Sequence, residues 1–333
     1  VTDTAPRELP LQELDEVIIR FAGDSGDGMQ LTGDQFTSIS AALGNDLATL
    51  PEFPAEIRAP QGTLAGVSAF QVRISDFAIT TPGDAPTVLV AMNPAALKAQ
   101  LHNVVQGGAI IVNTDAFNER NLEKAGYDSN PLDDGSLDGY RSYPVPMSQI
   151  TRDAVVEHGV KPRDAERSKN FFALGLISWM YTRPIEPTME FISTKFRGKE
   201  LVIKANEAAF YAGYNFGETA ELFESHYEIK PAELPSGEYT NINGNTAISW
   251  GCIAAGQLAQ LPIFLGSYPI TPASDILHDL SALKHFGART FQAEDEIAAA
   301  ASAIGAAFGG ALAFTTTSGP GIALKGEGLG LAV

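Results

Sequence analysis

The apolar and polar positions of the first third of the chain repeat in an order typical of alternating strands and helices. Residues 16–23 form a continuous apolar run, the glycine-rich stretch "GDSGDG" completes it, and the next segment has a helical period that ends at a glycine. The pattern predicts strands at 16–23, 67–75, 87–93 and 107–114 and helices at 29–44 and 94–105. Strands that alternate with helices favour a mostly parallel sheet with helices packed against it.

The middle of the chain lacks this rhythm. Residues 115–160 are rich in Asp, Asn, Gly and Pro, which predicts an irregular excursion before helices from about 164 to 220. Residues 223–245 are polar and contain prolines, as is typical of a connection between domains. We therefore expect a first domain over residues 1–222 and a connection over residues 223–245.

The strand and helix rhythm restarts after the connection and predicts a second α/β domain over residues 246–333. Its expected elements are helices at 246–260, 273–287 and 322–333, strands at 262–267 and 311–317, and an alanine-rich helix after "RTFQAEDE". The last helix is apolar up to Val333 and leaves this domain with few strands. We therefore expect the natural chain to continue beyond this residue.

Composition places the chain among soluble α/β proteins with two domains. Of its 333 residues, 44% are hydrophobic and 19% are charged, which is enough to bury a sizeable core in each domain. Asp and Glu total 40 against 22 Lys and Arg, and no run of basic residues could neutralise a phosphate backbone. We therefore expect no nucleic-acid partner.

Neither a membrane segment nor a secretory signal is predicted. The uncharged stretch 297–314 is only weakly apolar because it consists largely of alanine and glycine, and acids directly precede it. The first residues of the sequence do not combine a basic region with an apolar one. These features favour a cytoplasmic protein that does not contact a membrane.

A single cysteine limits the redox chemistry of the chain. Cys252 cannot form a disulfide within the chain and cannot supply the thiolates of an iron–sulfur cluster. It lies in an apolar stretch, which favours a buried structural thiol over a nucleophile. No metal site is predicted in this chain, and any cluster would have to belong to another chain.

The loop after the first strand is the first candidate site, and it comprises Gly23, Asp24, Ser25, Gly26, Asp27 and Gly28. Its glycines allow backbone N–H groups to approach a phosphate, although a simple turn between strand and helix explains them equally well. The loop does not match G-x-G-x-x-G, so an ordinary dinucleotide site is disfavoured. Asp27 stands in a Gly-Asp-Gly like that of some magnesium sites, but Asn45 lies too close and Asn93 too far to complete such a motif.

Three motifs of the second domain are expected at one edge of a sheet. In "SYPITP" two prolines hold the hydroxyl of Thr271 in a rigid loop. The acids of "EDE" complement the dipole of the following helix, or one of them is enclosed against a flat heterocycle and shares a proton with it. "TTTSGPG" at 315–321 is an ordinary strand end or a site loop with hydroxyl groups and backbone donors. Loops that follow parallel strands meet at the carboxyl edge of the sheet, where α/β proteins form their sites.

The motifs together resemble those of the 2-oxoacid:ferredoxin oxidoreductases. "SYPITPASDI", "EDEIAAAASAIGAAFGGALAFTTTSGPG" and "GEGLGLA" are similar to the family's pyrimidine-binding domain, and "GDSGDGMQLTGDQF", "FPAEIRAPQGTLAGVSAFQV", "LVAMNPAALKAQL" and "RSKNFFALGL" are similar to its gamma domain. The resemblance covers nearly the whole chain. It implies an α/β fold in which an N-terminal gamma domain precedes an incomplete pyrimidine-binding domain of the thiamine diphosphate fold, as in the 2-oxoglutarate type.

The resemblance also implies roles for residues of the second domain. The loop of Tyr268, Pro269, Ile270 and Thr271 would lie against thiamine diphosphate and the 2-oxoacid, with Thr271 offering its hydroxyl. Glu296 would hydrogen-bond the aminopyrimidine and share a proton with it, and Glu294 is the alternative. The loop at 23–28 would be associated with coenzyme A through its backbone or the pantetheine arm rather than through its two aspartates.

The implied reaction is the oxidative decarboxylation of 2-oxoglutarate to succinyl-CoA with electrons passed to ferredoxin, or the reverse carboxylation. Members of the family that act on pyruvate or on branched-chain 2-oxoacids are alternatives. Because the chain lacks the diphosphate half of the cofactor site, Mg²⁺ and a 4Fe–4S cluster would belong to a beta subunit. The resemblance implies a dimer of alpha–beta heterodimers.

Two interpretations of other classes remain open on the residues. One is a nucleotide-dependent dehydrogenase built on the first strand, loop and helix, and the other is a non-catalytic assembly domain. A nicotinamide-linked absorbance change by the chain alone would favour the dehydrogenase. Loss of assembly without loss of turnover in site variants would favour the assembly domain.

Overall fold

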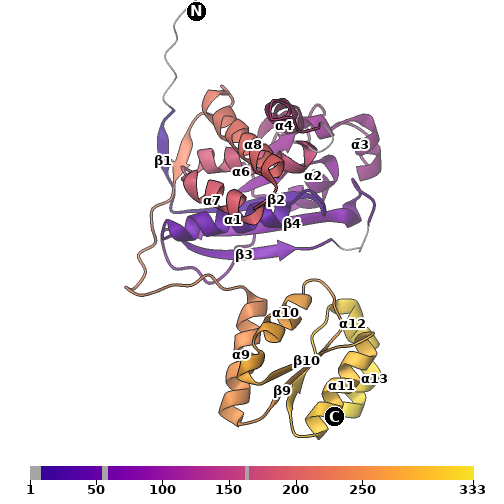
Figure 1. Cartoon of the computed structure of the whole chain (residues 1–333). Helices are drawn as coiled ribbons and strands as arrows, with labels where there is room; N and C mark the ends of the chain where they lie inside the picture. The colour runs from indigo at the N-terminus through magenta and orange to yellow at the C-terminus, as the bar shows by residue number, and fades with distance from the viewer. Residues whose placement is uncertain (1–8, 55–58, 162–164) are drawn as a thin grey trace, which may run out of the picture. The chain divides into compact units, whose positions relative to one another are not determined.

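The computed structural model describes residues 9–54, 59–161 and 165–333 (Figure 1). The chain divides into two compact units, residues 1–237 and residues 238–333, which are described separately. Residues 55–58 of the gamma-like motif and the expected helix start near residue 164 lie outside the described residues.

A six-stranded sheet forms the centre of the first unit, in the order β3-β4-β2-β5-β6-β7. The strands of this unit are β1 (Leu11–Glu13), β2 (Glu16–Asp24), β3 (Asp46–Glu52), β4 (Val67–Ser75), β5 (Val88–Ala91), β6 (Ala109–Asn113), β7 (Arg141–Val145) and β8 (His226–Glu228). From β2 through β5 and β6 to β7 the neighbours are parallel, whereas β4 runs antiparallel to both β2 and β3. The sheet is therefore mixed, and β1 and β8 form a separate parallel pair.

Helices cover both faces of this sheet (Figure 1). They are α1 (Met29–Ala42), α2 (Pro94–Gln100), α3 (Glu119–Ala125), α4 (Met147–Val156), α6 (Lys169–Met180), α7 (Glu186–Lys195) and α8 (Glu200–Thr219), with 3-10 turns at Leu64–Gly66, Leu101–Asn103, Thr114–Ala116 and Glu166–Ser168. Alternate residues of β2 face opposite cores: Ile19 and Phe21 contribute to the core with α1, α6 and α8, and Ala22 to the core with α2 and α3.

Helix α6 is enclosed along its whole length, since every residue from Asn170 to Met180 is buried. It crosses α8 at two glycines that leave no space for a side chain. A Cβ on Gly175 would overlap the carbonyl oxygen of Phe210, and a Cβ on Gly213 would overlap the carbonyl oxygen of Phe172. Backbone therefore meets backbone at this crossing, and the distance between the two helices is fixed by the absence of both side chains.

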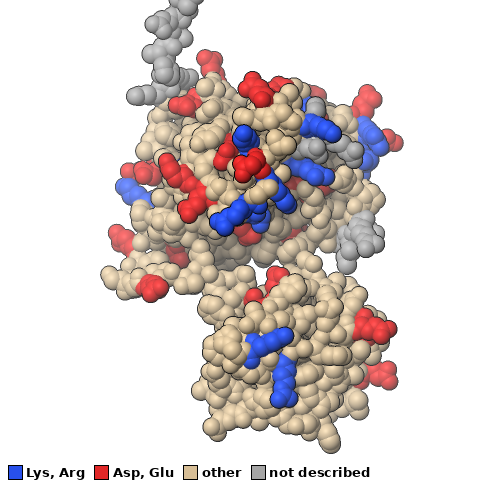
Figure 2. Space-filling model, in the orientation of Figure 1, with Lys and Arg blue, Asp and Glu red and all other residues tan. Residues whose placement is uncertain are grey.

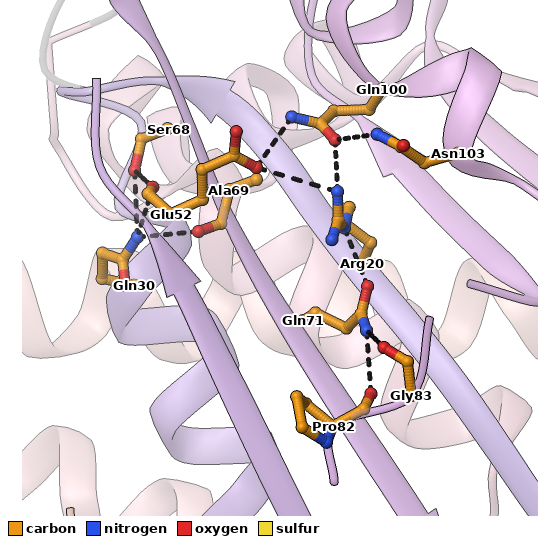
Figure 3. A network of polar contacts seen from close by, with 10 residues as sticks. All are labelled: Arg20, Gln30, Glu52, Ser68, Ala69, Gln71, Pro82, Gly83, Gln100 and Asn103. Carbon is orange, nitrogen blue, oxygen red and sulfur yellow. Dashed lines mark hydrogen bonds and ion pairs between the residues drawn. The ribbon is translucent and has the colours of Figure 1, made fainter. Parts of the chain in front are cut away.

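A buried arginine joins the antiparallel strands to α2 (Figure 3). Arg20 of β2 donates from Nε to Gln71 Oε1 on β4 at 2.9 Å and from Nη1 to Gln100 Oε1 at the end of α2, and Glu52 Oε2 lies 3.7 Å from Nη1. Burial lowers the pKa of Arg20, and the charge of Glu52 opposes that shift. These partners allow a charged residue to interrupt an otherwise apolar central strand.

The structure confirms the strands and helices predicted for the first third, but it adds the unpredicted strand β3 and differs in the middle. The expected irregular excursion at 115–160 is wrong, because this segment contains α3, β7 and α4. The signal of β7 is weak because this edge strand contains Pro144, whereas α4 repeats Met147, Thr151 and Val155 at helical spacing and could have been predicted. Of the segment expected as a connection, Phe223 and Ile229 belong to the core of the first unit and β8 pairs with β1.

The second unit contains a three-stranded parallel sheet in the order β10-β9-β11. Its elements are α9 (Gly244–Ala259), β9 (Ile263–Ser267), α10 (Ser274–Ala282), a 3-10 turn (Lys284–Phe286), β10 (Ala288–Gln292), α11 (Glu296–Phe308), β11 (Leu312–Phe314), α12 (Gly319–Leu324) and α13 (Gly326–Ala332). The single helix expected at 322–333 is instead two short helices that meet at Lys325, and the first of them already begins within "SGPG".

Charge is distributed unevenly between the units. On the face drawn in Figure 2, Lys and Arg of the first unit lie among Asp and Glu, whereas the second unit is mainly uncharged. Across the described parts of the chain, no helix combines the length and the apolar character needed to cross a bilayer.

The helix crossing makes a stability prediction. Gly213→Ala is expected to lower the unfolding free energy by about 1–3 kcal/mol, because the added methyl group overlaps the backbone of α6. Gly305→Ala is the matched control, since Gly305 lies inside α11 with no atom within 4 Å of the added Cβ. This control should gain roughly 0.5–1 kcal/mol from helix propensity. Denaturant titration of both variants measures the difference, and an unchanged midpoint for Gly213→Ala would show that the helices separate without cost.

Candidate functional site

The three motifs of the second unit lie at one edge of its sheet, as the sequence predicts. Because β9 is parallel to both β10 and β11, the segments that follow the three strands leave the sheet at the same carboxyl edge. These segments contain "YPITP", "EDE" and "TTTSGPG". The edge therefore gathers carboxylates, hydroxyl groups and glycines from segments about 25 residues apart in the sequence.

The "YPITP" loop follows β9. Tyr268 and Ile270 are half-buried, and Pro269 and Thr271 are exposed. Hydrogen bonds hold the loop at both ends: Ser267 Oγ lies 3.0 Å from Thr316 Oγ1 of the neighbouring loop, and Asn245 Nδ2 donates to the Pro272 carbonyl at 3.0 Å. The exposed hydroxyl of Thr271 is thus carried by a loop that is fixed to the sheet and to α9.

The three acids of "EDE" have different environments. Asp295 caps α11, since its Oδ1 accepts from the Ala298 N–H at 2.7 Å, and Glu294 is exposed. Glu296 is the first residue of α11 and is half-buried. Asp295 is therefore the cap, and Glu296 lies in the first turn of α11 as the half-buried acid at the sheet edge.

Glu296 and the "TTTSGPG" loop together form a small cradle. A Cβ on Gly321 would lie 3.0 Å from Cγ of Glu296 and would overlap Oγ1 of Thr317, so only glycine lets these two side chains pack this closely against the loop backbone. Thr317 Oγ1 is buried and has no hydrogen-bond partner among the described residues. A carboxylate, an unpaired hydroxyl and a bare backbone fit the polar edge of a flat ring such as the aminopyrimidine of thiamine diphosphate.

Lys325 also belongs to this edge, although the sequence pattern did not single it out. Its side chain is buried beneath the "TTTSGPG" loop, where Nζ donates to Thr315 Oγ1 at 2.8 Å and lies 3.4 Å from the Thr316 carbonyl oxygen. Burial lowers the pKa of Lys325, and the negative charge of Glu296 opposes that shift. The sequence feature that could have identified Lys325 is its position as a lysine between the apolar segments "GIAL" and "GLGLA".

In the first unit the loop at 23–28 holds itself together through its own aspartates. The carboxylate of Asp24 accepts from the Gly62 N–H at 3.0 and 3.1 Å. Asp27 accepts from the Asp24 N–H at 3.0 Å and pairs with Lys169 Nζ at 2.9 Å. A Cβ on Gly23 would lie only 2.9 Å from Asp27 Oδ2. Both carboxylates are thus used inside the protein.

The electrostatics of the loop agree with this use. Burial raises the pKa of Asp24, the charge of Asp27 adds to the shift, and the hydrogen bond from Gly62 opposes it. The Ser25 N–H donates to the Gly66 carbonyl at 3.2 Å, which ties the loop to the start of β4. The loop therefore offers a ligand its backbone and glycines rather than a free acid.

Two cavities flank this loop. A polar cavity of about 400 Å³ lies outside the carboxyl ends of β2, β5 and β6, where the strand order reverses, and Asp24, Asn93, Asn113 and Lys169 line it. A larger cavity of about 670 Å³ lies on the other side. Its walls include Gly26, Asp27, Gly28, Leu31, Lys161, Arg167, Asn170, Phe171, Phe196 and Lys199.

Few described residues could bind a metal ion or act as a nucleophilic thiol. Within residues 9–54, 59–161 and 165–333, no three His, Cys, Asp or Glu side chains are grouped so that they could hold a metal ion. Cys252 is half-buried in α9, and burial raises the pKa of its thiol. A raised pKa keeps the thiol protonated and makes it a poor nucleophile.

Two family models match the chain. Residues 18–216 match the model described as pyruvate ferredoxin/flavodoxin oxidoreductase. Residues 255–333 match the thiamine diphosphate-binding model of pyruvate flavodoxin/ferredoxin oxidoreductase. The matched ranges contain the loop at 23–28 and the whole carboxyl edge of the second sheet.

Individual relatives are also similar. The 2-oxoglutarate oxidoreductase subunit KorA of Mycobacterium tuberculosis is 59% identical over 97% of this chain and 49% of its own length. The 2-oxoglutarate synthase subunit KorA of Archaeoglobus fulgidus is 47% identical over 27% of this chain and 25% of its own length.

Among solved structures, the 2-oxoglutarate:ferredoxin oxidoreductase of Magnetococcus marinus, with 2-oxoglutarate, coenzyme A and succinyl-CoA bound, matches 94% of this chain and 49% of its own chain, with a TM-score of 0.69 and 30% identity. This chain thus spans about half the length of these longer proteins. The family model for residues 18–216 alone covers more than half of the sequence. The chain belongs to the pyruvate ferredoxin/flavodoxin oxidoreductase family.

Proposed function

We propose that this chain forms the gamma and pyrimidine-binding parts of a thiamine diphosphate-dependent 2-oxoglutarate:ferredoxin oxidoreductase. The enzyme would convert 2-oxoglutarate to succinyl-CoA and pass electrons to ferredoxin, or run in reverse. The observation that carries the proposal is the cradle of Glu296, Thr317 and Gly321 at the carboxyl edge of the second sheet. The choice of 2-oxoglutarate rests on the Mycobacterium tuberculosis relative and on the ligands named for the Magnetococcus marinus structure.

The residues of the second unit divide the work at this edge. Glu296 would hold and return a proton at the aminopyrimidine, and Asp295 would fix the start of α11 so that the Glu296 carboxylate stays in the cradle. Thr271 would present its hydroxyl to the 2-oxoacid from the rigid loop that also contains Tyr268, Pro269 and Ile270. When bound, thiamine diphosphate would supply the nucleophilic thiazolium carbon.

A partner subunit would complete the site. The chain has one cysteine, and its described residues group no metal ligands, so Mg²⁺ and a 4Fe–4S cluster would reside on a beta subunit. The proposed assembly is a dimer of alpha–beta heterodimers that works in the cytoplasm with ferredoxin. The relatives' designation as subunits supports a multi-chain enzyme.

Coenzyme A would use the larger cavity beside Gly26 and Gly28. Three cationic side chains of that cavity, Lys161, Arg167 and Lys199, suit the phosphates, and its apolar wall suits the rest of the molecule. Asn170 also lines the cavity, and its buried Oδ1 has no partner among the described residues, so a small movement of this side chain would let it accept from an amide N–H of pantetheine. The smaller cavity fits less well because three carboxylates in its walls offset its three cationic side chains, whereas the larger cavity has only the carboxylate of Asp27.

The role of Glu296 can be tested with a matched pair of substitutions. Glu296→Gln keeps the shape of the side chain but cannot release a proton, so exchange of the thiazolium C2 proton should slow by a factor on the order of 10² or more. Glu294→Gln is the control, because Glu294 is exposed two residues away. The measurements are C2 proton exchange and 2-oxoglutarate-dependent reduction of a viologen dye by the assembled enzyme. If Glu294→Gln alone abolishes exchange, the roles of the two acids are reversed; if both variants exchange normally, the thiamine proposal fails.

The coenzyme A site is best tested at Gly26. Its Cβ would have only an ordinary contact, 3.7 Å from Gln61 Nε2, so Gly26→Val should fold while adding bulk beside the larger cavity. The apparent KM for coenzyme A should rise more than the KM for 2-oxoglutarate. Gly28→Val is less informative, because Gly28 has a φ of 75° and its Cβ would lie 2.8 Å from Asn170 Nδ2. A folded Gly26→Val variant with an unchanged KM for coenzyme A would leave the loop as a simple turn.

The division of cofactors between subunits predicts the behaviour of the chain alone. Purified without its partner, it should show no iron–sulfur absorbance in the visible range and should bind thiamine diphosphate only weakly, since each site lacks its second half. Addition of the partner subunit should restore tight binding. Iron-dependent absorbance in the single chain would contradict this division.

A further inference from the structure

A buried lysine lies at the same sheet edge as the cradle. Lys325, where α12 meets α13, is 1% exposed. Its partners are the Thr315 hydroxyl and, at a longer distance, the Thr316 carbonyl oxygen, and the described residues bring no carboxylate into ion-pair contact with it. Burying an ammonium group with so few partners opposes folding. Stability therefore does not explain why a lysine occupies this position.

Lys325 is connected to both loops that form the candidate site. Its ammonium holds the end of β11 through Thr315 and Thr316, and the Thr316 hydroxyl lies 3.0 Å from Ser267 Oγ, directly before the "YPITP" loop. Its own backbone N–H donates to the Gly321 carbonyl at 3.2 Å, one helical turn away. The residue thus lies behind the cradle rather than in it.

Charge gives Lys325 a second connection to the cradle. The negative charge of Glu296 opposes the lowering of the Lys325 pKa by burial. The two residues also meet at Gly321, because a Cβ there would lie 3.0 Å from Glu296 Cγ and its carbonyl oxygen accepts from the Lys325 N–H at 3.2 Å.

We infer that Lys325 is a positioning residue of the site: its ammonium fixes the end of β11 and thereby the loop that packs against Glu296. This inference rests on the proposed thiamine function. It explains why the ammonium is buried although its burial destabilises the folded protein, because the buried ammonium serves the site rather than the stability of the fold.

The test replaces the ammonium with an apolar side chain of similar length in the assembled enzyme. Lys325→Met should slow C2 proton exchange of bound thiamine diphosphate on the order of 10-fold, less than loss of the proton-sharing group itself. The unfolding temperature should stay the same or rise, because a buried charge has been removed.

Two further variants make the test specific. Lys284→Met removes the same charge at an exposed position before β10, at the opposite end of the strands, and should leave the exchange rate unchanged. In the double variant, Lys325→Met should have no further effect once Glu296→Gln is present, because the two residues act through one proton.

The outcomes separate the inference from the proposed function. Normal exchange in Lys325→Met, or a fall in unfolding temperature that parallels the slower exchange, would show a structural hydrogen-bond donor and overturn the inference. Additive effects in the double variant would overturn it as well. If Glu296→Gln itself exchanges normally, the proposed function has failed, whatever Lys325→Met does.

Discussion

The close approach of α6 and α8 is the constraint on which the first unit depends. Because Gly175 and Gly213 let the two backbones touch, α6 fits entirely beneath α8 and against the sheet. The first turn of α6 then reaches the loop after β2, where Lys169 pairs with Asp27 and the side chain of Asn170 lies against Gly28. If a methyl group on either glycine pushed α6 away from α8, Lys169 and Asn170 would no longer contact the loop. Packing in the core of the first unit therefore determines the geometry of the loop at the edge of its sheet.

The second unit achieves the same precision by a different route. Its three parallel strands end at one edge, and the hydroxyl pair of Ser267 and Thr316 joins two of the loops there. Small residues then bring the third segment close, since Gly321 leaves room for Glu296. The parallel direction of the strands is enough to bring the three segments to one edge. The contact of Glu296 with the "TTTSGPG" loop depends, in addition, on the absence of a side chain at Gly321.

Much of this arrangement could be predicted from the sequence, because its signals are local. The apolar run of β2, the helical period of α1 and the proline-bracketed Thr271 all depend on neighbours in the chain. The antiparallel position of β4, the ion pair of Asp27 with Lys169 and the burial of Lys325 depend on partners distant in sequence or on tertiary packing. Helix α4 was missed although its buried Met147, Thr151 and Val155 recur at helical spacing. Among the acids, the resemblance already favoured Glu296 over Glu294, and the fold added that Asp295 caps α11.

The self-contained hydrogen bonding of the loop after β2 has a consequence for molecular recognition. Asp24 and Asp27 already fix the loop without any ligand, so a molecule that binds beside it does not have to order it first. The entropy lost when the loop becomes ordered is part of the free energy of folding, so it does not weaken the binding of a ligand. Discrimination at this surface then depends on shape, because a rigid backbone accepts a ligand that matches its contour and cannot adjust to one that does not.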